Sequence, residues 1–192
     1  MTNMKQEYFV LNETFVDDEI YIKNDGMNET ERETVVEGKI IQRPQDVYEF
    51  YYAKKTLKDF VTSEVTTHVV SEKFKAVLDK IGVSGVAFYP AKLMRTPRSK
   101  KSFDNYFMMV VESVSAFDYK NSTYTGIEEE NYIGTVQKLE VNASKIEGKH
   151  IIRLEELLFP IIITQELKEA LEQAQVTGTE YMPINNFHFP VY

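Results

Sequence analysis

The sequence predicts an α+β fold in a single domain, with two equivalent strand-helix-strand units packing helices on a mixed or mainly antiparallel sheet. The stretch Ser71–Pro90 recurs near the end of the chain as Thr164–Pro183. Within each copy the apolar pattern changes from that of a strand to that of a helix and back. A chain of 192 residues with 43% hydrophobic residues can bury one substantial core. We therefore expect one sheet of at least five strands and two main helices.

The two copies share residues at both apolar and turn positions. With the strands that enter them, they form repeats at 69–90 and 162–183. A solenoid needs about three or more stacked units, so two copies indicate a pair of equivalent helices instead. The identical positions are Lys75 and Lys168, Leu78 and Leu171, Val83 and Val176, Gly85 and Gly178, and Pro90 and Pro183.

The middle of each copy has the i, i+3, i+4, i+7 spacing of an amphipathic helix. Ser71 and Thr164 precede these helices at N-cap positions, where a hydroxyl accepts a hydrogen bond from an unpaired backbone N–H. A glycine then permits the turn into the next strand. The apolar stripes are Phe74, Val77, Leu78 and Ile81 in the first copy, and Leu167, Ala170, Leu171 and Ala174 in the second.

The other strands are predicted from runs of β-branched and aromatic residues. Tyr106–Val111 is continuously apolar, which is typical of a central strand buried on both faces. Tyr48–Tyr52 is interpreted as a strand, although Val47, Phe50 and Leu57 are also compatible with a helix. Further strands are expected at 8–11, 20–22, 65–70, 114–119, 135–141, 151–154 and 160–163.

Composition limits the chemistry that the chain can perform. There is no cysteine, which excludes disulfides, thiolate metal sites and cysteine nucleophiles. The sequence has no signal peptide and no apolar run of about 18 residues, so we expect a cytoplasmic protein without a membrane partner. Its three histidines, His68, His150 and His188, lack metal-ligand spacing, and no phosphate-binding glycine motif occurs. Neither a metal nor a cofactor is therefore expected.

Two alternatives to a binding protein remain open at this point. Glu112 and Asp118 could form a carboxylate pair across adjacent strands, as a small hydrolase would need. Such pairs are more commonly solvent-facing strand residues, so we expect no enzyme activity. A ligand-binding module of unknown substrate would instead have a concave apolar pocket with a few polar groups.

The net charge of −8 lies mostly in the N-terminal part of the chain. Between Glu13 and Glu37, nine acidic side chains are accompanied by only two basic ones. Such a run is either a solvated face or a surface that steers a basic partner into place. The basic loop from Lys92 to Lys101 lacks interleaved aromatic side chains, and nucleic-acid binding is therefore not expected.

Several segments resemble a known family. They are His68–Lys73, Ala87–Pro90, Tyr106–Val111, Val114–Asp118, Ile152–Leu154 and Ile161–Leu171. Together they resemble immunity protein family eleven of the bacterial polymorphic toxin systems, over about residues 57–185, with 1–56 as a variable N-terminal part. The resemblance implies a small cytoplasmic protein without enzyme activity that binds and neutralises a cognate toxin domain.

A toxin that cuts nucleic acid often presents a basic cleft, which an acidic inhibitor can occlude. Charge would then supply the association rate, and buried aromatic side chains would supply affinity. The candidate partner-binding residues are Asp17, Asp18, Glu19, Glu29, Glu31, Glu33, Tyr119, Tyr124, Glu128, Glu129 and Glu130.

Overall fold

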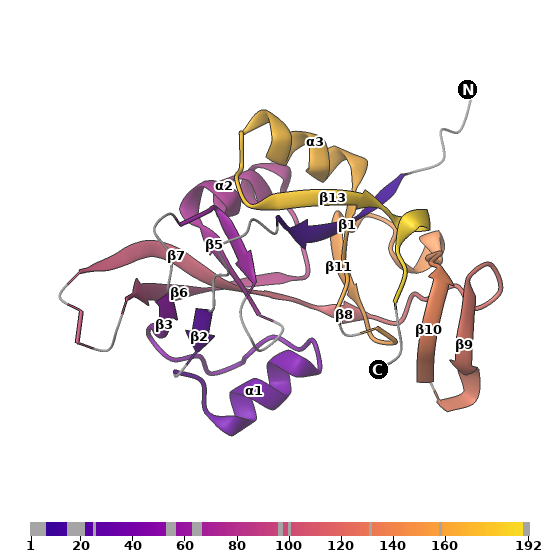
Figure 1. Ribbon diagram of the computed structural model, residues 1–192, viewed down its shortest axis with the longest axis horizontal. Helices are drawn as coiled ribbons and strands as arrows, with labels where there is room; N and C mark the ends of the chain where they lie inside the picture. The colour runs from indigo at the N-terminus through magenta and orange to yellow at the C-terminus, as the bar shows by residue number, and fades with distance from the viewer. Residues whose placement is uncertain are drawn as a thin grey trace.

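The computed structural model describes residues 7–14, 22–24, 26–52, 57–62, 67–95, 98–99, 101–130, 132–157 and 159–189. Within these ranges the strands form two large sheets and one two-stranded sheet, with α-helices packed on them (Figure 1). None of the helices in these ranges is long and apolar enough to cross a membrane.

The larger sheets have six and five strands. In spatial order, the first contains β2 (Ile22–Asn24), β3 (Tyr48–Tyr52), β6 (Val86–Met94), β7 (Ser102–Val111), β5 (His68–Ser71) and β4 (Phe60–Thr62). The second contains β13 (Thr179–Pro183), β1 (Tyr8–Glu13), β12 (Ile161–Thr164), β11 (Ile151–Leu154) and β8 (Ser113–Val114).

The third sheet is a hairpin of β9 (Thr123–Ile127) and β10 (Tyr132–Lys138). The α-helices are α1 (Glu29–Val36), α2 (Glu72–Ile81) and α3 (Gln165–Gln173), and the short 3-10 helices are η1 (Glu128–Glu130), η2 (Ala143–Lys145) and η3 (Ile184–Asn186). β3 pairs in parallel with β6, and β11 with β8, whereas the other strand pairs are antiparallel. The predicted α+β class with a mixed sheet is confirmed.

Both repeats form the predicted strand-helix-strand unit, but in different sheets. β5 and β6 lie on either side of β7, and β12 and β13 lie on either side of β1. The register is equivalent, because Phe107 pairs with Val70 and Pro90 while Phe9 pairs with Ile163 and Pro183. The expectation of one sheet is wrong. The two strands of each repeat pair with a third strand that lies between them, and this strand is β7 in the first repeat but β1 in the second.

The equivalence extends to one more strand in each sheet. β4 pairs with β5 as β11 pairs with β12, with Phe60 opposite Val70 and Ile151 opposite Ile163. We call β6, β7, β5 and β4 with α2 the α2 half, and β13, β1, β12 and β11 with α3 the α3 half. The N-terminal strand β1 therefore belongs to the half built by the C-terminal repeat.

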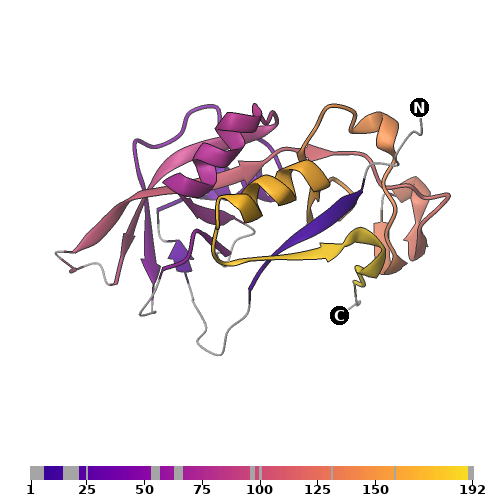
Figure 2. The ribbon, with the colours of Figure 1, turned by 90° about the horizontal axis from the view of Figure 1, so that it is seen from above.

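The two helices lie side by side over the sheets and share one core (Figure 2). Phe74 and Leu78 of α2 pack in the same buried cluster as Leu167 and Leu171 of α3, together with residues of both large sheets. Both predicted N-caps are confirmed, since Ser71 Oγ accepts from Phe74 N (3.3 Å) and Thr164 Oγ1 accepts from Leu167 N (3.4 Å). The helices therefore join the halves into one body.

Several predicted strands are shifted or shortened. The strand expected at 114–119 is reduced to β8, followed by a single bridge between Phe117 and Val141. The strand expected at 135–141 begins and ends three residues earlier, as β10. The predictions at 106–111 and 48–52 are confirmed by β7 and β3, whereas α1 has no counterpart in the sequence predictions.

Candidate protein-binding surface

Helix α1 carries part of the N-terminal acidic run. Glu29 and Glu33 are exposed, as predicted for a solvated or partner-binding face. Glu31 is only 5% exposed and is therefore a structural residue, contrary to the expectation that it contacts a partner. Its carboxylate accepts from Asn28 N (3.0 Å) in a capping box and from Tyr48 Oη (2.8 Å). Asp17, Asp18 and Glu19 lie outside the described residues.

The C-terminal end of α1 is held by Arg153, a buried residue of β11. Its guanidinium donates to the carbonyls of Val35 (3.1 Å) and Val36, and its Nε donates to Ser113 Oγ (3.2 Å). A cation at this end compensates the partial negative charge of the helix dipole. Burial lowers the pKa of Arg153. The sequence contained one signal for this role, a lone arginine in an apolar strand.

His68 has a structural position in β5. Its ring stacks on Phe60 with centroids 5.0 Å apart, and its Nδ1 lies 3.4 Å from Thr62 Oγ1. Removal from water, and then the nearby Arg153 cation, lower the pKa of His68 to about 4. The ring is therefore neutral at pH 7.

The second acidic group lies on the β9–β10 hairpin, which projects at one end of the molecule (Figure 1). Glu128, Glu129 and Glu130 form η1 between the strands, and all three are exposed. Ile127 and Tyr132 pair across the hairpin beside them and are also exposed, at 46% and 54%. We call these five residues the hairpin tip. Three carboxylates next to two apolar side chains form a surface suited to a basic protein partner.

Tyr119 and Tyr124, the latter on β9, form a cluster with Phe117. The ring centroids are 4.9 Å apart for Phe117 and Tyr119, 5.3 Å for Phe117 and Tyr124, and 5.6 Å for the two tyrosines. All three contacts have edge-on geometry, which favours aromatic pairs. Phe117 is buried and the tyrosines are half-buried. The structure thus brings both predicted aromatic residues together.

A buried carboxylate that the sequence analysis missed lies beside this cluster. Glu156 is 8% exposed and accepts from Ser115 Oγ at Oε1 (2.8 Å). Its Oε2 is buried and has no hydrogen-bond partner among the described residues. Burial, and then the charges of Glu156 and Glu128, raise the pKa of Tyr119, so both carboxylates act on the same phenol. No sequence pattern marked Glu156, because glutamate is usually exposed.

The two residues considered for a hydrolase, Asp118 and Glu112, have different surroundings. Asp118 accepts from Asn121 Nδ2 (2.7 Å) and from the backbone N–H groups of Lys120 and Asn121 (both 3.1 Å). The Asn121 side chain contributes most to lowering the pKa of Asp118, which favours its ionised form. Glu112 is exposed at the end of β7. In the described part of the chain, no group of three or more His, Cys, Asp or Glu side chains could hold a metal ion.

A shallow groove of about 340 Å³ lies where β1 and β13 meet η3. It is lined by Glu7, Tyr8, Phe9, Glu140, Pro183, Ile184 and Asn185. Burial raises the pKa of Tyr8, so its hydroxyl is neutral over the physiological range. The groove has the mixed lining expected of a ligand site, but the predicted site residues lie elsewhere.

The two acidic groups occupy separate places. Figure 1 shows α1 below the six-stranded sheet and the β9–β10 hairpin at a different end of the molecule. Tyr124 lies on the same hairpin as the tip and packs against Tyr119, whereas Glu29 and Glu33 lie apart on α1. A partner that contacts both groups must span the distance between α1 and the hairpin.

Comparison with known proteins identifies the family. No curated protein matches the chain. The sequence model described as "Immunity protein family (Imm11)" matches residues 7–186, which include every α-helix and strand described above. The chain therefore belongs to the Imm11 immunity protein family.

Proposed function

We propose that this protein acts in the bacterial cytoplasm, where it binds the toxic domain of a cognate toxin and blocks it without catalysing a reaction. The observation that carries this proposal is the family match over residues 7–186, which covers both halves of the fold. Asp118, one of the two residues considered for a hydrolase, accepts three hydrogen bonds from Lys120 and Asn121, as a residue that shapes a turn does.

We propose further that the hairpin tip covers a basic site on the toxin. Its three carboxylates attract positive charge over about 10 Å at moderate salt, which mainly increases the association rate. Ile127 and Tyr132 beside them can be buried on contact, and buried apolar area slows dissociation. Glu29 and Glu33 on α1 form a second acidic surface that extends the attraction.

Co-expression tests the function. Where a large secreted protein is encoded next to this chain, its C-terminal domain is expressed in a sensitive bacterium with and without this protein. Restored growth and co-purification of the two proteins are the expected results. Continued growth arrest, with the immunity protein present and folded, would contradict the proposal.

A triple charge reversal tests the surface. Changing Glu128, Glu129 and Glu130 to Lys should lower the association rate at least tenfold at low salt and flatten its salt dependence. The matched control reverses three other exposed carboxylates, Glu147, Glu169 and Glu180, and so produces the same net charge. Equal rates for the two triple variants would mean that the overall charge, and not the hairpin tip, determines association.

A further inference from the structure

The Glu156 carboxylate is incompletely satisfied in the free protein. Ser115 engages Oε1, but Oε2 is buried without a hydrogen-bond partner in the part of the chain that the structure describes. An unpaired buried carboxylate oxygen costs free energy, and the cost is larger when the group is charged. A cation that reached this oxygen would remove the cost and add its own attraction.

Glu156 is linked to an aromatic cluster through Ser115, which precedes Phe117 by two residues, and Phe117 packs against Tyr119 and Tyr124. These rings are suited to the same ligand. The half-buried rings of Tyr119 and Tyr124 meet at 72°, so their faces point in different directions around the cluster. A guanidinium or ammonium group is attracted to the face of such a ring, more strongly when it leaves water. Glu128 adds an exposed carboxylate on the side of the hairpin tip.

The combination of two aromatic rings and a carboxylate around a cation occurs twice within the described part of the protein. Lys75 Nζ lies 5.4 Å and 5.7 Å from the ring centroids of Phe88 and Phe107, and 2.5 Å from the Asp79 carboxylate. In the α3 half, Lys168 lies over Phe9 and Tyr181 at 5.2 Å and 5.8 Å and contacts Glu172 at 3.1 Å. In both halves, two rings and one carboxylate therefore surround the ammonium group of a lysine of the protein's own chain.

We propose that Tyr119, Tyr124, Glu128 and Glu156 bind an arginine side chain of the toxin. Arginine fits better than lysine, because its planar guanidinium stacks on aromatic rings and can donate to two carboxylates at once. In this site the exposed carboxylate of Glu128 would accept from the guanidinium, and Glu156 would accept through Oε2. The identity of the partner depends on the proposed toxin-binding function, whereas the chemistry of the site does not.

A small probe tests the chemistry without the toxin. Isotope-labelled protein is titrated with N-acetyl-arginine amide and, separately, with N-acetyl-citrulline amide, which has nearly the same shape but no charge. Saturable NMR shifts of the Tyr119 and Tyr124 rings and of the Glu156 side-chain carboxyl carbon are expected, with a Kd on the order of 1–10 mM for the arginine probe. The citrulline probe should bind at least tenfold more weakly.

Two variants test whether the arginine probe binds through Glu156. Glu156→Gln keeps an oxygen that can accept from Ser115 but removes the negative charge. It should raise the Kd of the arginine probe at least fivefold. Glu155→Gln, which changes the exposed neighbouring residue, should leave the Kd within a factor of two. If Glu156→Gln does not fold, Tyr124→Leu is used instead, because the loss of an aromatic ring face should also raise the Kd of the arginine probe.

Non-saturable shifts, equal affinity for citrulline, or unchanged binding in the variant that folds would overturn the proposal. If the proposed toxin-binding function is wrong but the arginine site is right, the probe should still bind at Tyr119 and Tyr124, whereas co-expression should not restore growth. In the full complex, Glu156→Gln should increase the dissociation rate about tenfold.

Discussion

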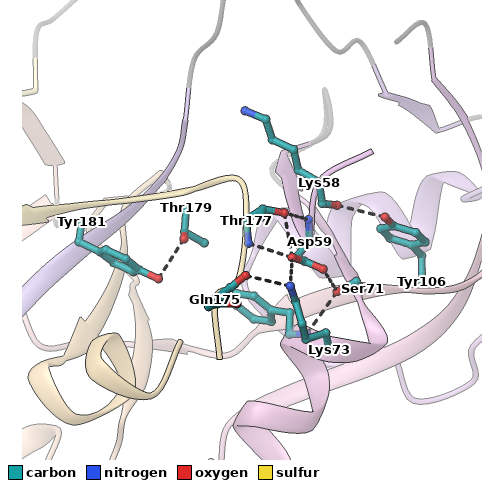
Figure 3. Close-up of polar contacts among 10 residues, drawn as sticks. Lys58, Asp59, Ser71, Lys73, Tyr106, Gln175, Thr177, Thr179 and Tyr181 are labelled. Carbon is teal, nitrogen blue, oxygen red and sulfur yellow. Dashed lines mark hydrogen bonds and ion pairs between the residues drawn. The ribbon is translucent and has the colours of Figure 1, made fainter. Parts of the chain in front are cut away.

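Lys73 Nζ lies 2.7 Å from Asp59 Oδ2, and this ion pair links α2 to the residue that precedes β4 (Figure 3). The same carboxylate accepts from Ser71 Oγ (2.7 Å) and from Thr177 N and Oγ1 (both 2.8 Å), while Lys73 also donates to the Gln175 carbonyl (2.9 Å). Thr177 and Gln175 belong to the turn after α3. One carboxylate therefore connects the two halves.

The α3 half has a pair of side chains at the equivalent positions. His150 precedes β11 as Asp59 precedes β4, and Glu166 occupies the helix position of Lys73. His150 Nδ1 lies 3.6 Å from Glu166 Oε2 and 3.2 Å from the N-cap Thr164 Oγ1. The duplicated fold thus retains a side-chain interaction between the helix and the residue before its neighbouring strand, formed by Lys73 and Asp59 in one half and by Glu166 and His150 in the other.

Replacing Asp59 by Asn should destabilise the protein by about 2–3 kcal/mol at pH 7, because Lys73, Ser71 and Thr177 lose a charged acceptor. Asp79→Asn is the matched control and should cost about 0.5 kcal/mol. Its carboxylate also pairs with a lysine but is 54% exposed, compared with 15% for Asp59. Chemical denaturation measures the free energy of unfolding of both variants. Equal decreases would mean that burial of the ion pair has no effect on stability.

The Asp59 contribution should depend on pH. Burial raises the pKa of the Asp59 carboxyl, but the bonds from Lys73, Ser71 and Thr177 outweigh it, so the folded-state pKa lies below its usual range. The stabilisation is therefore complete above the unfolded pKa of about 4 and is lost as the pH falls through the folded pKa. The stability difference between the wild type and Asp59→Asn should be constant from pH 8 to 5 and shrink below about pH 4. A difference that grows on acidification would contradict this.

Gly178→Ala should destabilise the protein more than Gly148→Ala. Both glycines have positive φ, +89° and +74°, so both substitutions introduce backbone strain of about 1 kcal/mol. At Gly178 an added Cβ would also lie 2.4 Å from the Phe60 carbonyl oxygen, whereas at Gly148 nothing lies within 4 Å. We expect an additional loss of about 2 kcal/mol at Gly178, measured as a lower unfolding midpoint. Equal midpoints would show that the β4 backbone moves away without cost.

Arg153→Met should release α1 from the body of the protein. The substitution keeps much of the side-chain volume but leaves the Val35 and Val36 carbonyls without their buried donor, at a cost of about 2–4 kcal/mol. Hydrogen exchange should accelerate in α1 more than in α2. Uniform acceleration would mean that Arg153 supports the whole fold and not α1 in particular.

The sequence was most informative where structure depends on neighbours along the chain. The repeats, their N-caps at Ser71 and Thr164, and the buried strand at Tyr106–Val111 follow from local spacing, and all are present. The division into two sheets could not be predicted, because it depends on β1 pairing with strands about 150 residues away. The sequence contains one weak indication of that pairing. The same dipeptide, Tyr-Phe, occurs at equivalent positions of the two central strands, as Tyr8-Phe9 in β1 and Tyr106-Phe107 in β7.

The candidate site was predictable only in part. Tyr124 and the three glutamates of η1 belong to one hairpin, and Tyr119 packs against Tyr124. Glu31 and Glu156 show why the burial of individual residues could not be predicted. Both are glutamates, which composition places at the surface, and both are buried through contacts with distant residues such as Tyr48 and Ser115. Burial of a charged residue depends on tertiary packing that the local pattern does not encode.

Glu156→Gln should make the free protein more stable. In the wild type, Oε2 of a buried carboxylate has no partner in the described ranges, and a neutral amide of the same shape is less costly to bury than a charge. We expect a gain of about 1 kcal/mol, seen as a rise of about 2–4 °C in Tm, whereas the exposed neighbour Glu155→Gln should change Tm by less than about 1 °C. A lower Tm for Glu156→Gln would mean that the carboxylate already stabilises the fold. A higher Tm combined with faster dissociation of the toxin would mean that Glu156 favours binding at the expense of stability, as residues of functional sites often do.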